Sequence, residues 1–396
     1  MHIIGIIAEY NPIHLGHIYH INKIKENFPD SIIILITNSS FTQRGDISIL
    51  NKWDKTQIAL NNNIDLVIEL PFAFATQSAD IFAKGAIEIL NKLQIDTLAF
   101  GSESNDLSKL ENIVETQLNN PEYNNKVKEY LKEGINYPTA MSKALASLLG
   151  DTTSSPNDLL GISYIKEIKR NNYPIKPFTI KRIGDYHEKE VNNQIISASL
   201  IRTLFNTNQD ITPHIPNNTQ KYLYQNLSHE TYFPYLKYKI LSTPDLSIYQ
   251  TVEEGIENRI QKAINISNSW EELVQNIKTK RYTHNKINRM LIHILTSFTK
   301  QEATKLTIDY IRVLGFNIKG KKHLNKIKNN LDIPLITSYK KNLSPLLDLE
   351  QRITSIYYLP IDPIKAQTEY QRKPIIKIPS TSNIPLSPLD IASNDK

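Results

Sequence analysis

Two histidines that flank a leucine and a glycine give the clearest chemical signal in the sequence. His14, Gly16 and His17 lie within the stretch IIGIIAEYNPIHLGHIYH, residues 3–20. Imidazole N–H groups can donate hydrogen bonds to a phosphate whose negative charge grows during its transfer. Gly16 has no side chain, so a phosphate or a planar base can approach the backbone there. The spacing predicts a nucleotide site in which His14 and His17 are catalytic.

A second set of candidates comes from the hydroxyl-rich segment Ser197-Ala198-Ser199-Leu200-Ile201-Arg202. Ser199 and the N-terminus of a helix could hold one phosphate while Arg202 binds another. An ordinary capped helix explains this pattern equally well when it stands alone. Its position after the His-x-Gly-His segment favours phosphate binding.

The residues around His14 predict the elements that hold it. Ile3 to Ala8 is a short apolar run, typical of a buried parallel strand. Asn11-Pro12 ends it, because proline has no N–H for a strand ladder. A helix is expected from about Gly16. The two histidines then lie in a strand-to-helix turn, where free N–H groups and the helix dipole favour an anion.

Strands and helices alternate through about residue 205, which predicts a doubly wound parallel sheet of the Rossmann-like type. Ligands of such sheets bind beyond the C-terminal ends of the strands. The turns at His14, Gln43-Arg44 and Gly101 should therefore meet at one edge. For Asn157 or Asp158, the commonest use would be a helix N-cap. Further strands are expected at residues 31–37, 65–70, 97–100 and 178–183, and helices at 51–60, 79–93 and 107–149.

Composition narrows the class of protein. The 396 residues include no cysteine, which excludes disulfides and thiolate metal sites and fits the cytoplasm. No apolar stretch approaches twenty residues, so we expect neither a signal peptide nor a transmembrane helix. No metal-binding motif is recognisable.

The net charge of +6 is concentrated in one segment. Residues 278–328 contain 13 Lys or Arg against two acidic residues. Such a segment suits a phosphate backbone, although a solvated basic helix is the alternative. Helical spacing places His293 with Lys286 and Arg289 on a polar face, and Tyr282 could stack on a base or simply pack. The candidate RNA-binding residues are Lys280, Arg281, Lys286 and Arg289.

Several short segments together resemble the bacterial tRNA(Met) cytidine acetate ligase family, within the HIGH-type nucleotidyltransferase superfamily. The resemblance extends to about residue 360. The segments that carry it are Glu9-Tyr10-Asn11-Pro12-x-His14-x-Gly16-His17, Phe41-x-Gln43-Arg44-Gly45, Asp65-Leu66-Val67-Ile68-Glu69-Leu70-Pro71, Phe100-Gly101-Ser102-Glu103, Ser155-Pro156-Asn157-Asp158, Ile196-Ser197-x-Ser199-x-x-Arg202, Lys280-Arg281-Tyr282-Thr283 and Arg312-Val313-Leu314-Gly315-Phe316.

The resemblance implies an activity. Members of this family activate acetate with ATP as acetyl-adenylate and pass the acetyl group to N4 of the wobble cytidine in elongator tRNA(Met). Mg²⁺ commonly assists such transfers. By position, the ATP-binding residues would be Ile7, Ala8, Glu9, Tyr10, Asn11, Pro12, Ile13, His14, Leu15, Gly16, His17, Ile18, Tyr19, His20, Gly101, Asn157 and Arg182, with Ser199 and Arg202 added from the helix pattern.

We therefore expect an ATP-binding catalytic domain over residues 1–205, a mainly helical, basic tRNA-binding domain over 206–360 and a proline-rich, extended or partly disordered tail over 361–396. A nucleotidyltransferase acting on a small phosphorylated metabolite fits the N-terminal motif equally well, but it has no use for a basic segment. A non-catalytic RNA-binding protein is the third interpretation, and intact His14, His17 and Arg202 argue against it. The sequence predicts no oligomeric state.

Overall fold

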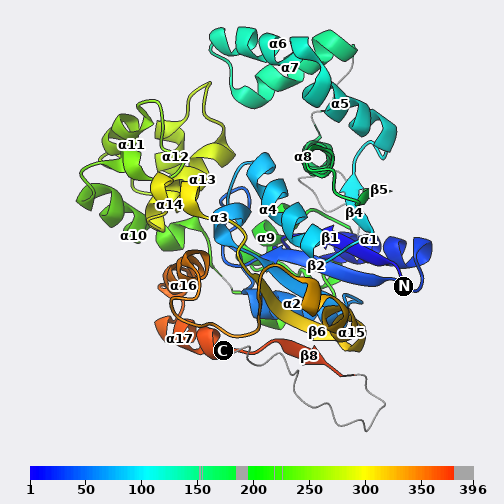
Figure 1. Cartoon of the computed structure of the whole chain (residues 1–396). Coiled ribbons are helices and arrows are strands. Elements are labelled where there is room, and N and C mark those ends of the chain that lie inside the picture. Colours follow the sequence, from blue (N-terminus) through cyan, green and yellow to red (C-terminus); the bar gives the residue numbers. More distant parts are fainter. Residues whose placement is uncertain (151–152, 154, 184–194, 218, 225, 379–396) are drawn as a thin grey trace.

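One mixed sheet organises the chain (Figure 1). The computed structural model describes residues 1–150, 153, 155–183, 195–217, 219–224 and 226–378. The strand order is β5-β4-β1-β2-β3-β6-β7, and β8 also pairs with β6. The first five strands in this order are parallel, whereas β6 runs antiparallel to β3. Their bounds are β1 Ile3–Ile7, β2 Ile32–Asn38, β3 Leu66–Leu70, β4 Thr97–Ser102, β5 Lys176–Lys181, β6 Ile311–Asn317, β7 Leu335–Ile336 and β8 Ile375–Lys377.

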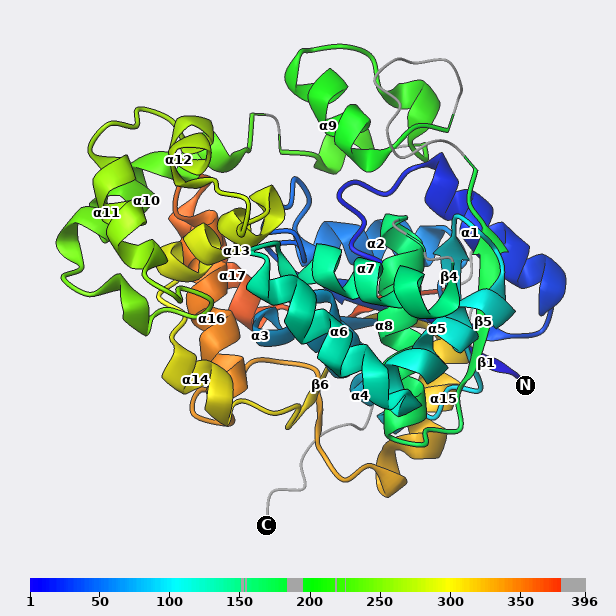
Figure 2. The same cartoon turned by 90° about the horizontal axis from the view of Figure 1, so that it is seen from above.

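The sheet is covered on both faces, which explains its unbroken apolar strands. Every residue of β2 is buried; Ile34 contacts one core, while Ile33 and Leu35 contact the other. A strand with alternating polar residues would leave polar groups in one of these cores. Helices α1 (Leu15–Asn27), α2 (Lys52–Asn61) and α9 (Ala198–Asn206) cover one face. Helices α3 (Phe72–Ala75), α4 (Ala79–Lys92), α8 (Pro156–Arg170) and α15 (Ile318–Ile327) cover the other, and Figure 2 shows α9 and α15 on opposite sides.

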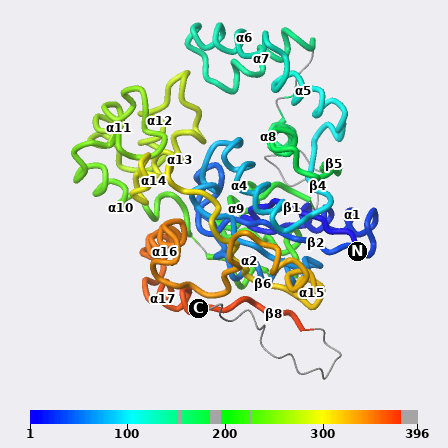
Figure 3. The backbone as a smooth tube through the Cα atoms, in the orientation of Figure 1, coloured from blue at the N-terminus to red at the C-terminus, as the bar shows by residue number. Residues whose placement is uncertain are grey.

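Two helical regions flank this core. Helices α5 (Leu107–Asn119), α6 (Pro121–Lys132) and α7 (Tyr137–Leu149) join α8 and lie at the top of Figure 1. Helices α10 (His229–Ser242), α11 (Ile256–Ile264), α12 (Trp270–Ile277), α13 (His284–Leu295) and α14 (Lys300–Lys305) form the second region. Figure 3 follows the chain from there back into β6 and on to α16 (Pro345–Tyr358) and α17 (Pro363–Gln371).

The predicted fold class is confirmed: a largely parallel sheet with helices on both faces is followed by a mainly helical region. Strands β6, β7 and β8 extend the sheet, which the alternation of elements up to residue 205 does not predict. The prediction of an extended or partly disordered tail from residue 361 is wrong for residues 363–371, where helix α17 forms; residues 375–377 are extended and pair with β6 as β8. The domain boundaries at residues 205 and 360 remain an interpretation.

The basic segment 278–328 does not form one patch. Arg312 lies in β6 and is 3% exposed, beside Glu69 of the neighbouring strand. Helix α15 packs on the sheet, whereas α13 belongs to the second helical region (Figures 1 and 2). The cations of the basic segment 278–328 are therefore divided between α13 and α15, which lie far apart. Strand β6 separates these two helices along the chain.

A group of buried charged residues, here called the buried ion cluster, joins the two ends of the chain. The Lys52 ammonium lies 2.7 Å from Glu69 and 2.9 Å from Glu369 of α17. Arg312 lies 4.0 Å from the other oxygen of Glu69. Burial, and then the charge of Glu69, raises the pKa of Glu350 to about 8. Two cations therefore face three carboxyl groups, of which Glu350 holds its proton more strongly than a free glutamate does.

Candidate active site

The His-x-Gly-His turn folds so that both imidazoles present an N–H group. His14 is the N-cap of α1, and its Nδ1 accepts a hydrogen bond from the Gly16 N–H at 3.0 Å. The His17 Nδ1 accepts one from the His14 N–H at 3.2 Å. Since each Nδ1 is an acceptor, each neutral ring carries its proton on Nε2. The local sequence thus supplies two Nε2 donors at a helix N-terminus.

Burial keeps these rings uncharged. It lowers the pKa of His14 to about 3, with a further contribution from Arg182. Burial and then His14, Arg182 and His20 lower the pKa of His17 well below its usual range, and burial followed by Arg182 lowers that of His20 to about 4. The ring centroids of His14 and His17 are 3.8 Å apart, and neutral rings can lie this close without electrostatic repulsion. Both can donate to an anion near pH 7.

A cleft of about 1000 Å³ opens beyond the C-terminal ends of β1, β4 and β5. Ten of the fourteen candidates between residues 7 and 20 line it, as do all five from later in the chain. The candidates brought together are Ile7, Ala8, Glu9, Tyr10, Asn11, His14, Gly16, His17, Tyr19, His20, Gly101, Asn157, Arg182, Ser199 and Arg202. Those outside the lining are Pro12, Ile13, Leu15 and Ile18, and Ile13 is completely buried in the core.

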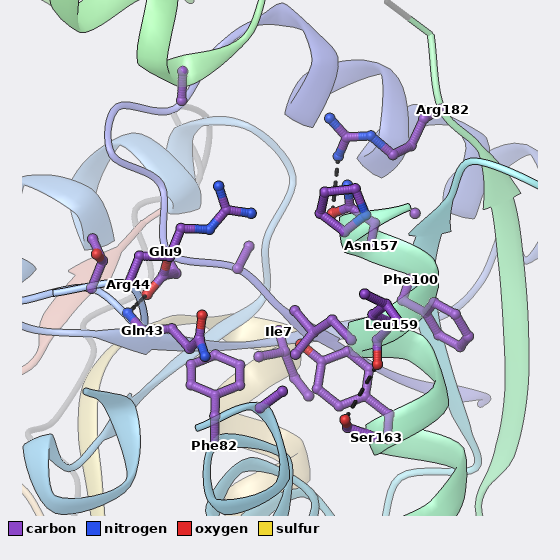
Figure 4. Close-up of a pocket in the computed structure, with 18 of the residues that line it drawn as sticks. Ile7, Glu9, Gln43, Arg44, Phe82, Phe100, Asn157, Leu159, Ser163 and Arg182 are labelled. Atoms are coloured by element: carbon purple, nitrogen blue, oxygen red, sulfur yellow. Dashed lines mark hydrogen bonds between the residues drawn. The ribbon is translucent and has the colours of Figure 1, made fainter. Parts of the chain in front are cut away.

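The loop after β4 and the start of α8 hold each other through two carboxylates. Glu103 accepts the backbone N–H of Asp158 at 3.0 Å, and Asp158 accepts those of Glu103 and Ser104, each at 3.1 Å. The N-cap of α8 is Ser155, so the prediction of Asn157 or Asp158 at that position is wrong. The side chain of Asn157 is thereby free to accept from Arg182 Nη1 at 3.3 Å (Figure 4). This clamp fixes one end of the cleft.

Arg202 has two protein partners. Its Nη1 donates to the Asn11 carbonyl at 2.7 Å, and its Nη2 lies 3.1 Å from the Asp46 carboxylate. These contacts tie the turn before α1 to α9. Ser197 is the N-cap of α9, and Ser199 Oγ lies 3.0 Å from Ser197 Oγ on the cleft side. The expected phosphate contact of Arg202 thus competes with a contact that positions the His14 turn.

Apolar residues form the floor of the cleft, and among those named here only Ile7 was a candidate from the sequence. Ile7 from β1, Phe82 from α4 and Leu159 from α8 surround it in Figure 4. Ser163 donates to the Leu159 carbonyl at 3.3 Å, which satisfies its hydroxyl. In the sequence, the apolar residues of the floor cannot be distinguished from core residues. Helical spacing identifies the apolar face of a helix but not what packs against that face.

Glu9 places a carboxyl group in the lining of the cleft. One oxygen of its carboxylate accepts the Gln43 backbone N–H at 2.6 Å (Figure 4). Burial raises the pKa of Glu9, while that hydrogen bond and then Lys55 oppose the rise. Lys55 donates to Asn38 Oδ1 at 2.9 Å, and burial lowers its pKa to about 7. Glu9 thereby holds the Gln43-Arg44 turn at the edge of the sheet, as the parallel topology predicted.

Two predictions for α13 need correction, and the alternative left open for Tyr282, just before this helix, is decided. His293 is fully buried: it lies 2.8 Å from the Thr76 carbonyl and 3.0 Å from Thr251, so it cannot meet phosphates. Tyr282 is 5% exposed and donates to the Glu253 carbonyl, so it packs and does not stack on a base. Arg289 points into the cleft and away from an outer basic face, because the 42–46 turn covers that side of α13. Arg281 is exposed and pairs with Glu254 at 3.1 Å.

The described residues contain no group of three or more histidine or acidic side chains placed to hold a metal ion. No helix in the described ranges is long and apolar enough to cross a membrane.

Known proteins are similar to this chain in both sequence and fold. A family model described as HIGH Nucleotidyl Transferase matches residues 1–373. A tRNA(Met) cytidine acetate ligase of Anoxybacillus flavithermus is 37% identical over 95% of this chain and 100% of its own length. One of Bacillus subtilis is 37% identical over 94% of this chain and 95% of its own. The structure of Thermotoga maritima TmcAL bound with alpha-thio ATP superposes with a TM-score of 0.86 at 26% identity, covering 95% of this chain and 99% of that one.

Proposed function

The chain belongs to the tRNA(Met) cytidine acetate ligase family of HIGH nucleotidyl transferases, and we propose that it joins acetate to N4 of the wobble cytidine of elongator tRNA(Met), with ATP as the activating substrate. One observation carries this: two neutral Nε2–H donors face a cleft that also contains Arg182 and the start of α9. We propose a cytoplasmic location, because the proposed substrate is a tRNA.

In the first proposed step, a carboxylate oxygen of acetate attacks the α-phosphorus of ATP. The bond from that phosphorus to the bridging oxygen breaks, pyrophosphate leaves and acetyl-adenylate forms. His14 and His17 donate to phosphate oxygens as charge develops on them, which suits donors that are already fixed in place. Arg182, whose charge acts on both histidines, supplies a positive charge in the same cleft.

In the second step, the cytidine N4 attacks the acetyl carbon, AMP leaves with the electrons of the broken C–O bond, and the amine loses a proton. A carboxylate is a poor acyl donor until its oxygen becomes part of a better leaving group, which adenylation provides. The same cleft can serve both steps, since the adenylate formed in the first is the acyl donor of the second.

We propose the following binding residues. ATP contacts come from the lining residues of positions 7–20 together with Gly101, Asn157, Arg182 and Ser199. Phosphate oxygens of ATP, more than protein carboxylates, would hold a Mg²⁺ ion, which would neutralise charge on them. The exposed Lys280 and Arg281 and the partly exposed Lys286 contact the tRNA backbone.

The test is incorporation of radiolabelled acetate. Incubation with ATP, acetate and tRNA should label the tRNA, with AMP and pyrophosphate formed in equal amounts to the label. Omitting ATP should abolish labelling. If acetyl-coenzyme A labels the tRNA without ATP while free acetate does not, the proposed function is wrong.

A further inference from the structure

Arg289 brings a guanidinium into the cleft from the second helical region. Its Nη1 makes a long contact of 3.4 Å with the Gln43 carbonyl, and its buried Nε has no hydrogen-bond partner among the described residues. Burial, and then the charge of Arg44, lowers its pKa to about 10. A guanidinium has five N–H donors, so this one retains most of its capacity for an anion.

The position of Arg289 is fixed by close packing. Gly45 adopts φ +83° in the turn that carries Arg44, and a Cβ there would lie 2.6 Å from the Arg289 backbone nitrogen. His229 contacts the Gly45 carbonyl at 2.8 Å and stacks on Trp270, with ring centroids 4.7 Å apart. Trp270 in turn donates to Asn288, next to Arg289, at 3.0 Å. Arg44 and Arg289 are therefore held side by side before any ligand arrives.

The nearby chemistry favours a phosphate of a polynucleotide. In the proposed function, the ATP phosphates already have hydrogen-bond donors at the starts of α1 and α9. Arg289 belongs to neither helix. Thr283 and Asn285, at the start of α13, are exposed and line the cleft. The cations at 280, 281 and 286 lead from the surface to that rim. A strand bound there would place a phosphate at Arg289 and an unpaired base deeper in the cleft.

We propose that Arg289, with Arg44 beside it, binds the backbone phosphate adjacent to the cytidine that is acetylated. This subsite rests on the proposed function and makes it specific: it positions the strand for the second step and takes no part in the first. The target base must leave its stack to be reached, and a fixed phosphate contact would hold the strand in that extended form.

The experiment pairs a protein change with an RNA change. Arg289→Gln removes the charge, and a single uncharged methylphosphonate removes that of one phosphate in an anticodon stem-loop RNA. Binding of the stem-loop by Arg289→Gln should weaken at least tenfold, and its log–log salt dependence should fall by about one unit. The methylphosphonate next to the target cytidine should weaken wild-type binding to a similar extent and Arg289→Gln binding by less than twofold.

Controls separate the alternatives. Lys262→Gln, an equal charge change on the exposed side of α11, should alter stem-loop affinity by less than twofold. Arg289→Lys keeps the positive charge but lacks the planar guanidinium, so its stem-loop affinity should fall between those of the wild type and Arg289→Gln. It also supplies a second variant if Arg289→Gln folds poorly. Acetate-dependent exchange of pyrophosphate into ATP, measured without tRNA, should change by less than twofold in both Arg289 variants.

Two results would overturn the subsite. The first is that Arg289→Gln and the methylphosphonate weaken stem-loop binding independently at every methylphosphonate position, so that their two factors multiply. The second is a tenfold loss of the exchange reaction with normal stem-loop affinity, which would assign Arg289 to acetate or pyrophosphate. If the wild-type protein shows no acetate-dependent exchange, the proposed function fails, while the stem-loop binding data still decide the subsite.

Discussion

Two groups of ionisable side chains are withdrawn from water in this protein, and they differ in how completely they find protein partners. In the buried ion cluster, the Lys52 ammonium contacts two carboxylates and Arg312 lies 4.0 Å from Glu69, so each cation faces an opposite charge, although Glu69 Oε2 and Arg312 Nε make no described hydrogen bond. All five members are 5% exposed or less. In the cleft, the Nε2 atoms of His14 and His17 have no protein acceptor among the described contacts, and the Arg289 Nε has none either. A closed cluster stabilises one arrangement of the chain, whereas an incomplete one is prepared for a ligand.

The comparison predicts opposite consequences for the two groups. Removing a member of the closed cluster should cost stability, because it leaves a buried charge unpaired. Removing a donor from the cleft should cost activity with little loss of stability.

The largest expected effect is that of Lys52→Met. It leaves Glu369 buried without its cation and Glu69 with only Arg312 at 4.0 Å, and breaking such a buried pair typically costs about 3–5 kcal/mol of unfolding free energy. Urea denaturation measures it. Lys92→Met is the matched control, because Lys92 pairs with the well-exposed Asp332 at 2.7 Å and such pairs contribute no more than about 1 kcal/mol. Equal losses in the two variants would mean that the buried ion cluster is no more important than a surface pair.

His17→Ala should affect activity in the first step. It removes one fixed N–H donor to developing phosphate charge, a loss that typically costs roughly 10²–10³ in rate. Acetate-dependent pyrophosphate exchange measures this, and the urea midpoint should change little. Near-normal exchange in a folded His17→Ala protein would contradict the role given to this residue.

The two groups also differ in what the sequence reveals. His14, Gly16 and His17 are neighbours in the chain, and the strand and helix that hold them are visible as local patterns. The contact between Lys52 and Glu369 joins residues more than 300 positions apart, so no local pattern can predict it. Arg289 shows the same limit on a smaller scale: helical spacing placed it on a polar face, but only tertiary packing shows that the Gly45 turn covers that face.

Acidification should destabilise the cleft through its neutral histidines. The pKa of His20 is lowered to about 4 by burial, whereas an unfolded histidine has a value near 6.5. The unfolded chain therefore binds the proton first, and stability falls as the pH drops below about 6.5. Between pH 7 and pH 5, His20 alone should contribute about 2 kcal/mol to this fall. Urea titrations at both pH values should show that His20→Gln loses less unfolding free energy between pH 7 and pH 5 than the wild type does, by that amount.

An unchanged pH dependence in His20→Gln would mean that this ring is protonated in the folded protein. Its Nε2 is buried without a described partner, so an added proton there would be unpaired. That geometry is the reason for expecting the neutral form.

The smallest effect concerns the exposed cations, and it tests whether residues 278–328 act as one surface. Lys280 is exposed, and the partly exposed Lys286 lies with its ammonium 4.6 Å from the centre of the Tyr282 ring. Lys280→Gln combined with Lys286→Gln should weaken tRNA binding by several-fold and lower the log–log salt slope by about two, since each exposed phosphate contact is largely screened. Lys319→Gln with Lys322→Gln removes the same charge from α15, where both residues are exposed. Because α15 packs on the sheet far from the cleft-side start of α13, that pair should leave tRNA affinity within twofold. Equal losses from the two pairs would restore the single basic patch that the sequence predicted and would require the tRNA to reach both elements at once.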